Sequence, residues 1–195
     1  MKPGVKVKPL VVLLTLLGLA YPFAVYFGLQ VFSPLTIAFC LLGFLAIRLF
    51  VQWREKKQMI EMVALVLTLI CVAVLMVVDQ MLAVKSYPVA LSLSLAAVFS
   101  YSVLHPPTFI ERFARLLEPN LNEKGVRYTR KVTVVWIGFF IVNASISAGT
   151  ALYGDLDVWT FYNGFLSYIF IGVVMGIELL VRQFVKKQHV GTAHD

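Results

Sequence analysis

The sequence predicts an all-α, polytopic membrane protein with six transmembrane helices and one short interfacial amphipathic helix. Three observations lead to this prediction. Of the 195 residues, 60% are hydrophobic and only 14% are charged, with a mean hydropathy of +0.86. A soluble domain of this length could not hide so much apolar surface in one core, so the bilayer must act as its solvent. The apolar residues gather in six long runs, and basic residues flank these runs mainly on one side.

The charge pattern gives the chain an orientation. Of the lysines and arginines that flank the runs, all but Lys85 fall on the side of the membrane that carries the N-terminus. Cytoplasmic loops retain positive charge, so we expect both termini in the cytoplasm. Attraction to anionic lipid headgroups, roughly 1 kcal/mol for each cation, explains the net charge of +7. Nucleic acid is therefore not an expected partner.

Each apolar run can form a helix that crosses about 30 Å of hydrocarbon. The expected helices cover residues 10–31, 34–51, 59–78, 88–104, 132–153 and 160–181. The first run has the basic start of a signal peptide and small residues at Gly18 and Ala20, but its apolar stretch continues to Val31. We interpret it as an anchor, so that all 195 residues belong to one integral membrane domain.

A short helix is expected between the fourth and fifth runs, over residues 108–118. Thr108 and Glu111 have the spacing of a capping box, and Pro119 ends the helix. Its apolar face would hold Phe109, Ile110, Phe113, Leu116 and Leu117, opposite four charged residues. A helix of this kind lies in the membrane interface. A turn-rich stretch over residues 120–125 would follow, before the fifth run.

The run from Tyr128 to Phe140, together with Asn143, resembles the aromatic-Thr-Arg, Trp and Phe-Phe pattern of a late helix in the intracellular septation protein A family. Further stretches are similar to that family over most of the chain, namely Pro22 to Tyr26 and the residues Asp79, Lys85 and Pro88. The longer and more basic segment over residues 108–131 departs from the family, so the chain looks like a divergent branch.

The resemblance implies a bacterial inner-membrane protein that supports cell-envelope biogenesis or division. Related membrane proteins occur beside gene clusters for aryl polyene lipids, which would place this one near lipid synthesis. The resemblance implies no established enzyme activity. It also implies no cofactor.

Two carboxylates lie within the apolar runs, where burial of a charge is expensive and suggests function. Glu61 and Glu178 each have a cation four residues away, Lys57 and Arg182 respectively, near the cytoplasmic ends of their helices. An interfacial ion pair is the simpler interpretation of both.

Small and polar residues inside the runs are expected to pack helices together. Asn143 should link helices by hydrogen bonds, and Gly172 and Gly176 should allow close approach of a neighbouring helix. Cys40 and Cys71 lie in separate runs without metal-ligand spacing, and we interpret them as small packing residues.

A cluster of basic residues surrounds the interfacial helix. Its members, with one neighbouring histidine, are His105, Arg112, Arg115, Arg127, Arg130 and Lys131. Attraction to anionic lipid explains the cluster most simply, while recognition of a phosphorylated ligand or of a protein partner stays open. His105 could carry protons, although a lone histidine before two prolines more often ends a helix. No phosphate loop, acyltransferase pattern, nucleophile elbow or metal motif is present in the sequence.

Two classes of function remain. We favour a non-catalytic component that docks envelope-synthesis or division proteins on its basic segment, and self-association stays open. The alternative is a transporter or membrane enzyme for a lipid or polyprenyl-linked substrate, with Asn143 and Glu178 lining an intramembrane cavity and the arginines holding an anionic head. A polar cavity between the helices would favour the second class, and tight packing the first.

Overall fold

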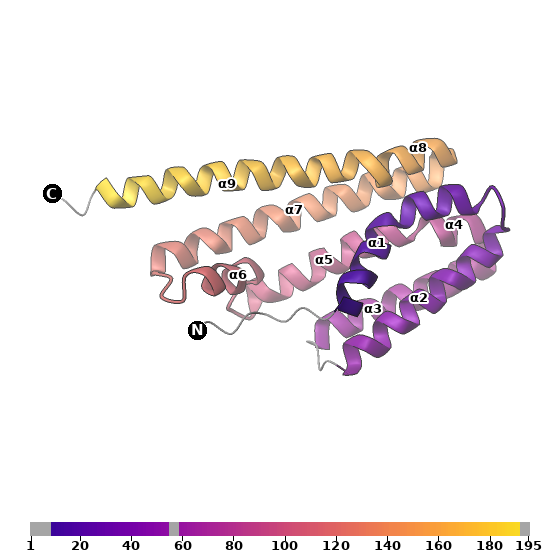
Figure 1. The fold of residues 1–195 in the computed structure, drawn as a ribbon, viewed down its shortest axis with the longest axis horizontal. Coiled ribbons are helices and arrows are strands. Elements are labelled where there is room, and N and C mark those ends of the chain that lie inside the picture. The colour runs from indigo at the N-terminus through magenta and orange to yellow at the C-terminus, as the bar shows by residue number, and fades with distance from the viewer. Residues whose placement is uncertain (1–8, 55–58, 192–195) are drawn as a thin grey trace.

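The protein is a bundle of long helices, described by a computed structural model over residues 9–54 and 59–191 (Figure 1). Within these ranges the elements are α1 (Pro9–Gly28), α2 (Pro34–Arg54), α3 (Met59–Val78), α4 (Gln80–Lys85), α5 (Tyr87–Leu104), α6 (Phe109–Leu117), α7 (Glu123–Tyr153), α8 (Leu156–Phe161), the π-helix η1 (Tyr162–Leu166) and α9 (Ser167–Gly191). The described part of the chain contains no strand, so the all-α prediction is confirmed.

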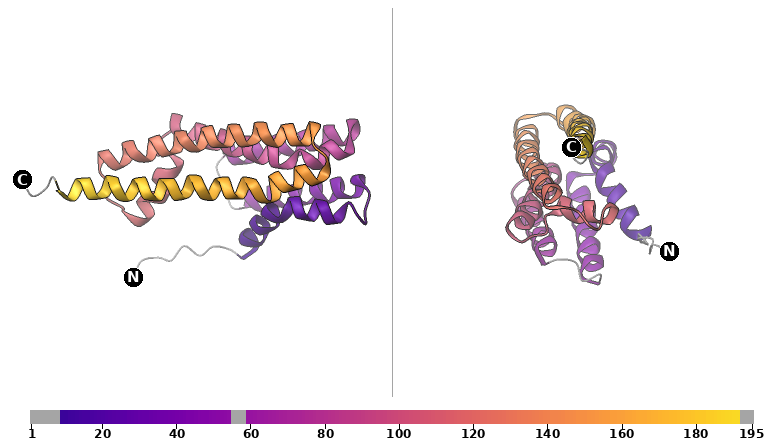
Figure 2. Two further views of the ribbon diagram at one scale, coloured as in Figure 1. Left: turned by 90° about the horizontal axis from the view of Figure 1, so that it is seen from above. Right: turned by 90° about the vertical axis from the view of Figure 1, so that its left-hand side faces the viewer.

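Five stretches are long and apolar enough to cross a membrane. They are α2, α3, α5, α7 and the continuous run of α8, η1 and α9 over Leu156–Gln183. A further apolar stretch in α1, Leu16–Gly28, is shorter. Successive long helices run in opposite directions, which places α6 at one end of the bundle and α4 with α8 at the other (Figures 1 and 2). A polytopic membrane protein is thus confirmed, and the crossing by α1 stays a prediction.

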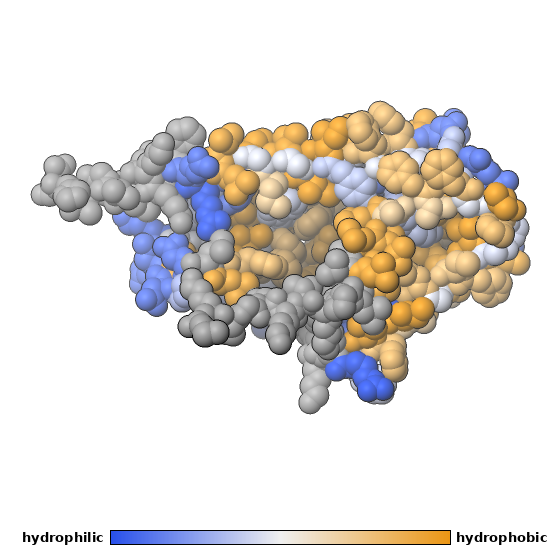
Figure 3. Space-filling view, viewed as in Figure 1, coloured by the Kyte–Doolittle hydropathy of each residue, from blue (hydrophilic) through white to orange (hydrophobic). Residues whose placement is uncertain are grey.

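The outer surface of the bundle is apolar along most of its length. Large hydrophobic side chains face outward from every long helix, for example Phe27, Leu67, Val135 and Val173. Figure 3 shows hydrophobic residues over the middle of one face and hydrophilic ones mainly toward the ends. Soluble proteins do not expose apolar bands of this size, so lipid is the natural partner of this surface.

The helices α5 and α7 form the most extensive pair in the bundle. Phe99 of α5 packs edge-on against Phe140 of α7, with ring centroids 5.2 Å apart, and Trp136 joins the same cluster. A second cluster lies around Val25, Leu41 and other buried residues of α1 to α5 and α8. Phe109 and Ile110 of α6 pack against the first cluster, which joins α6 to α5 and α7.

The largest difference from the expected boundaries is the start of α7. The helix begins at Glu123, well before the expected residue 132, and it includes much of the stretch predicted to be turns. The side chain of Asn122 accepts a hydrogen bond of 2.8 Å from the Gly125 N–H. This cap starts a helix in a polar segment that no hydrophobic pattern marks.

Short capped helices also replace two expected connections. Asp79 caps α4 by accepting from the Leu82 N–H at 3.0 Å, and Asp155 caps α8 by accepting from the Val158 N–H at 2.8 Å. The expected helices over 88–104 and 160–181 are therefore preceded by α4 and α8. At the other boundaries, α1 ends before residue 31, whereas α2 and α9 continue past residues 51 and 181. Backbone hydrogen bonding continues beyond the apolar run where polar residues can still propagate a helix.

The small residues singled out in the sequence do not pack inside the bundle. A Cβ added to Gly172 or Gly176 would meet no atom within 4 Å; Gly172 is exposed and Gly176 is half-buried. Cys40 and Cys71 are likewise exposed and free. The expected packing of these four residues is therefore wrong within the described part of the chain.

Candidate functional site

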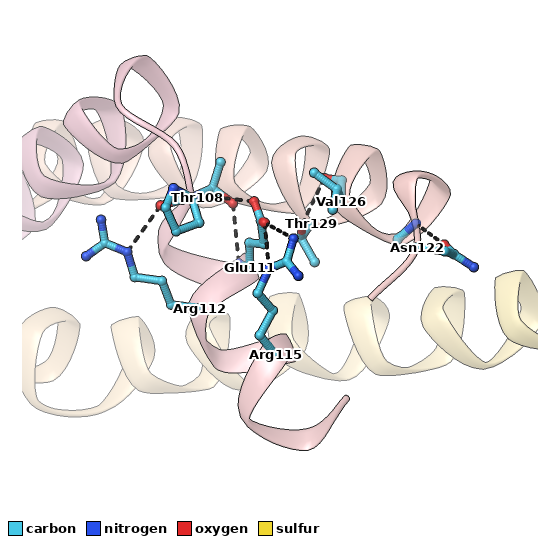
Figure 4. Close-up of polar contacts among 9 residues, drawn as sticks. Thr108, Glu111, Arg112, Arg115, Asn122, Val126 and Thr129 are labelled. Carbon is cyan, nitrogen blue, oxygen red and sulfur yellow. Dashed lines mark hydrogen bonds and ion pairs between the residues drawn. The ribbon is translucent and has the colours of Figure 1, made fainter. Parts of the chain in front are cut away.

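The short helix α6 is fixed to the end of α5 by polar contacts. Thr108 Oγ1 accepts from the Glu111 N–H and Glu111 Oε2 accepts from the Thr108 N–H, both at 3.3 Å, which confirms the predicted capping box (Figure 4). The Phe109 N–H donates to Ser102 Oγ of α5 at 2.9 Å. These bonds satisfy N–H groups that a helix start otherwise leaves unpaired.

The two sides of α6 have different neighbours. Phe109 stacks on Phe99 of α5, with centroids 4.4 Å apart, and Ala114 is buried. Phe113 and Leu116 are more than half exposed, at 55% and 62%. The amphipathic helix is therefore present as expected, and its exposed apolar side chains would suit the membrane interface, which stays a prediction.

A groove with a volume of about 660 Å³ lies between α6, α7 and α9, and we call it the aromatic groove. Figure 3 shows this face of the molecule hollowed beneath α9, with hydrophobic surface inside the hollow. Aromatic side chains of three helices line it, namely Phe99, Phe109, Phe113, Trp136 and Phe140. Polar residues that also line it are Glu118, Asn122, Lys124, Tyr128, Glu178 and Arg182. Its volume is in the range of sites for small ligands, about 300–1,000 Å³.

Glu178 contributes to the groove in a way that the sequence did not indicate. The Tyr128 hydroxyl of α7 lies within hydrogen-bond distance of the Glu178 backbone oxygen at 3.3 Å and of its Oε1 at 3.4 Å. The expected ion pair between Glu178 and Arg182 does not form, although both residues line the groove. Glu178 is therefore joined to α7 by Tyr128 rather than to the cation on its own helix.

The predicted basic cluster does not converge on one point. Arg115 pairs with Glu111 at 2.8 Å, and the Arg112 Nε donates to the Pro107 carbonyl at 3.1 Å (Figure 4). Arg127 lies 3.8 Å from Glu123, and both side chains are largely exposed. Each of these three arginines therefore binds to its own helix or to the residues just before it, which leaves no shared guanidinium site among them.

The three remaining members of the cluster, His105, Arg130 and Lys131, are exposed. Arg130 points outward from α7 and has no ion pair within the described part of the chain. The His105 ring stacks on Tyr101, with centroids 4.2 Å apart, and its Nδ1 lies 3.2 Å from the Tyr101 carbonyl. This contact fits the interpretation of His105 as a helix-end residue.

Asn143 links three elements, as expected. Its Nδ2 donates to Ser92 Oγ of α5, and its Oδ1 accepts from the Tyr162 hydroxyl of η1, both at 3.0 Å. Nearby, Ser147 of α7 bonds to Asn163 of η1. Asn143 does not line the aromatic groove, so the expectation that Asn143 and Glu178 share one cavity is wrong. The polar groups of Asn143 are used to hold helices together.

A second cavity, of about 300 Å³, lies between α1, α2, α3 and α5, and we call it the polar cavity. Its polar lining residues are Arg48, Gln52, Glu61, Thr68, Tyr87 and Ser94. Phe109 lines both the polar cavity and the aromatic groove. Sequence reasoning missed Arg48, although a cation inside the apolar run over 34–51 was a signal that could have found it. The Lys57 partner expected for Glu61 lies outside the described residues.

Metal binding is not indicated by the described residues, because they contain no group of three or more His, Cys, Asp or Glu side chains that could hold an ion. Comparison with family models, with curated proteins and with solved structures finds no match for this chain. Its function must therefore be inferred from the geometry of the two cavities and from the exposed arginines.

Proposed function

We propose that this chain is a multi-pass protein of the bacterial inner membrane that binds an anionic amphiphile in the aromatic groove and so supports cell-envelope biogenesis. The chain of the amphiphile would lie against the aromatic floor, and its head at the polar rim. One observation carries the proposal: a groove of about 660 Å³ combines an aromatic floor with two cations on its rim, Lys124 and Arg182. The resemblance to the septation protein A family implies a membrane protein that acts near lipid synthesis. Binding of an anionic amphiphile would suit such a protein.

The floor of the groove suits a hydrocarbon chain. Five aromatic rings from α5, α6 and α7 line one apolar surface. Transfer of apolar surface out of water is worth about 25 cal/mol per Å². A hydrocarbon chain that moves from the bilayer into the groove stays in an apolar environment, so this free energy is kept and not gained anew. Binding then depends on shape and on the head, which makes an acyl or polyprenyl chain a suitable occupant.

The rim favours a phosphate-bearing head. Arg182 offers planar N–H donors that can grip phosphate oxygens in pairs, and Lys124 adds a second charge from the start of α7. The two acids on the rim, Glu118 and Glu178, both have contacts within the protein. The residues lining the groove include no nucleophile paired with a base, so we propose binding and presentation rather than turnover.

Lipid retention tests this proposal. Protein in nanodiscs that contain a polyprenyl phosphate or its uncharged alcohol would be analysed by native mass spectrometry. We expect selective retention of the phosphate, reduced roughly tenfold to hundredfold by Arg182→Gln, since one bond to a charged group is worth roughly 1.5–3 kcal/mol. The matched control is Arg130→Gln, an exposed arginine of α7 outside the groove. Equal retention of phosphate and alcohol, unchanged by Arg182→Gln, would refute the proposal.

A second candidate function is the docking of an acidic envelope-synthesis or division protein. The observation that favours it is the exposed start of α7, where Arg127 keeps 67% of its side-chain surface exposed and Arg130 is exposed one turn later. Docking on this segment and lipid binding in the groove can coexist, because neither arginine lines the groove.

A further inference from the structure

The polar cavity brings charged and polar groups of three helices together inside the bundle. Arg48 and Gln52 are four residues apart on α2, so they lie on one face of that helix. Glu61 of α3 lines the same cavity, and Tyr87 of α5 forms part of its wall. The remaining wall is mainly apolar, apart from the hydroxyls of Thr68 and Ser94.

Arg48 has unused donors that face this space. Its guanidinium donates one hydrogen bond, of 3.2 Å, to the Tyr87 hydroxyl. A guanidinium has five N–H donors and stays charged in proteins. No salt bridge joins Arg48 to a carboxylate in the described part of the chain. A cation within a membrane-spanning helix almost always has a partner, so an anionic group is expected to reach it.

Two further groups of the cavity offer acceptors, while the Thr68 and Ser94 hydroxyls lie within hydrogen-bond distance of each other, at 3.3 Å. Gln52 Oε1 is buried and has no hydrogen-bond donor within the described residues, and such atoms are rare in folded proteins. Glu61 lines the cavity as well, without an ion pair to Arg48. One cavity thus presents a guanidinium together with two acceptors, so it matches a ligand that has an anion and N–H donors close together.

We propose that the polar cavity binds a zwitterionic group in which a primary ammonium lies beside a phosphate. The phosphate pairs with Arg48, and the ammonium donates to Gln52 Oε1 and to Glu61. The volume of about 300 Å³ is at the lower limit of ligand sites, which suits a headgroup. Either the head of a phosphatidylethanolamine lipid or a free phosphoethanolamine could supply this chemistry. The site is separate from the aromatic groove, although Phe109 lines both.

The full-length protein in nanodiscs allows a direct test. The nanodiscs would contain phosphatidylethanolamine mixed with its mono-, di- and trimethylated forms, and native mass spectrometry would count the lipids retained. We expect preference for the unmethylated head over the trimethylated one by about tenfold, falling stepwise with methylation, because each methyl group removes one N–H donor. Free phosphoethanolamine, added to the protein in detergent, distinguishes the two sources. Competition with retained lipid indicates the soluble ligand, and its absence indicates the headgroup.

Three variants assign the roles of the residues. Gln52→Leu and Glu61→Gln should each reduce the preference for the unmethylated head, while Arg48→Gln should reduce retention of all four heads together. The matched control is Arg54→Gln, because Arg54 is on the same helix but is exposed and lies over the Phe50 ring. Should Arg48→Gln fail to fold, Gln52→Leu, which changes no charge, still decides the matter. Equal retention of the four heads by the wild-type protein, or a preference unchanged by Gln52→Leu and Glu61→Gln, would overturn the proposal in favour of a water-filled cavity.

Discussion

At the scale of single residues, Lys85 stands out in the charge pattern as a topological marker, but in the structure it has a packing role. The sequence marks Lys85 as the lone cation on the far side of the membrane. The structure buries this lysine, and its Nζ donates to the Gly154 carbonyl at 2.9 Å. The Lys85 carbonyl in turn accepts from Trp159 Nε1 at 3.1 Å. Lys85 therefore joins α4 to the connection between α7 and α8.

Replacement of Lys85 by methionine tests this structural role. Methionine keeps most of the apolar stem but leaves the Gly154 carbonyl without its donor. We expect a loss of about 1–3 kcal/mol in the free energy of unfolding and a lower melting temperature. Thermal unfolding of purified protein in detergent would measure it. The control is Lys124→Met, since Lys124 is exposed. Identical melting temperatures for the two variants would contradict the role.

The residues of the two cavities show where sequence reasoning stops. Asn143 could be predicted as a link between helices, because an amide in a membrane helix needs a partner. Arg48 and Gln52 could not be recognised as a site, because their meaning depends on Glu61 and Tyr87 from α3 and α5 on the opposite wall. Spacing along one helix shows which residues share a face, but not which face of which neighbour they meet.

At the scale of elements, a short helix can be predicted from the sequence only where its start has a recognisable signature. The capping box at Thr108 predicts α6 correctly, and its reciprocal bonds form. α4 and α8 are only six residues long, so no hydrophobic period marks them, and a single aspartate caps each one. The π-helix η1 has no signature either, since it depends on how Tyr162 and Asn163 bond to α7.

The exposed side of α6 leads to a prediction about the membrane interface. Replacing Phe113 and Leu116 with aspartate should detach α6 from lipid, because each apolar side chain contributes about 1.5–3 kcal/mol when it is buried. A spin label at Arg115 should then become more accessible to a water-soluble relaxation agent. The paired variant Phe113→Leu with Leu116→Met keeps the side apolar and should leave the label depth unchanged. An equal depth in both double variants would count against interfacial binding.

The start of α7 leads to a prediction about docking. If Arg127 and Arg130 recognise an acidic partner through paired guanidinium contacts, lysine cannot replace them fully, because an ammonium lacks the planar fork. We expect partial complementation by the double Arg→Lys variant and none by the double Arg→Ala variant. The measurement is envelope integrity in a strain without the protein, at equal membrane abundance. Full complementation by the lysine variant would contradict specific recognition and would indicate that the segment is only attracted to anionic lipid by its charge.

At the scale of the whole molecule, the charge pattern predicts how the bundle is oriented in the membrane. The apolar band is bounded by an α6 end that carries Arg112, Arg115, Arg127 and Arg130 and by an α4 end whose lysine is buried. The helices alternate in direction between these ends (Figure 2). If basic segments stay in the cytoplasm, the α6 end is cytoplasmic and the α4 end faces outward. The alternating directions of the helices can be predicted from the sequence. The two cavities cannot, because they depend on how helices of different length pack against one another.

Cysteine labelling in intact cells tests this orientation. Cys40 and Cys71 would first be replaced with alanine, because both are free and exposed. Gln80→Cys, next to the α4 cap, should react with a membrane-impermeant maleimide, and Glu123→Cys, at the start of α7, should react only after the membrane is opened. Both native side chains are exposed, so burial would not block the reagent. Gly4→Cys extends the test to the first crossing, and it should behave like Glu123→Cys if α1 spans the membrane. Reaction of positions 80 and 123 from the same side would contradict the topology.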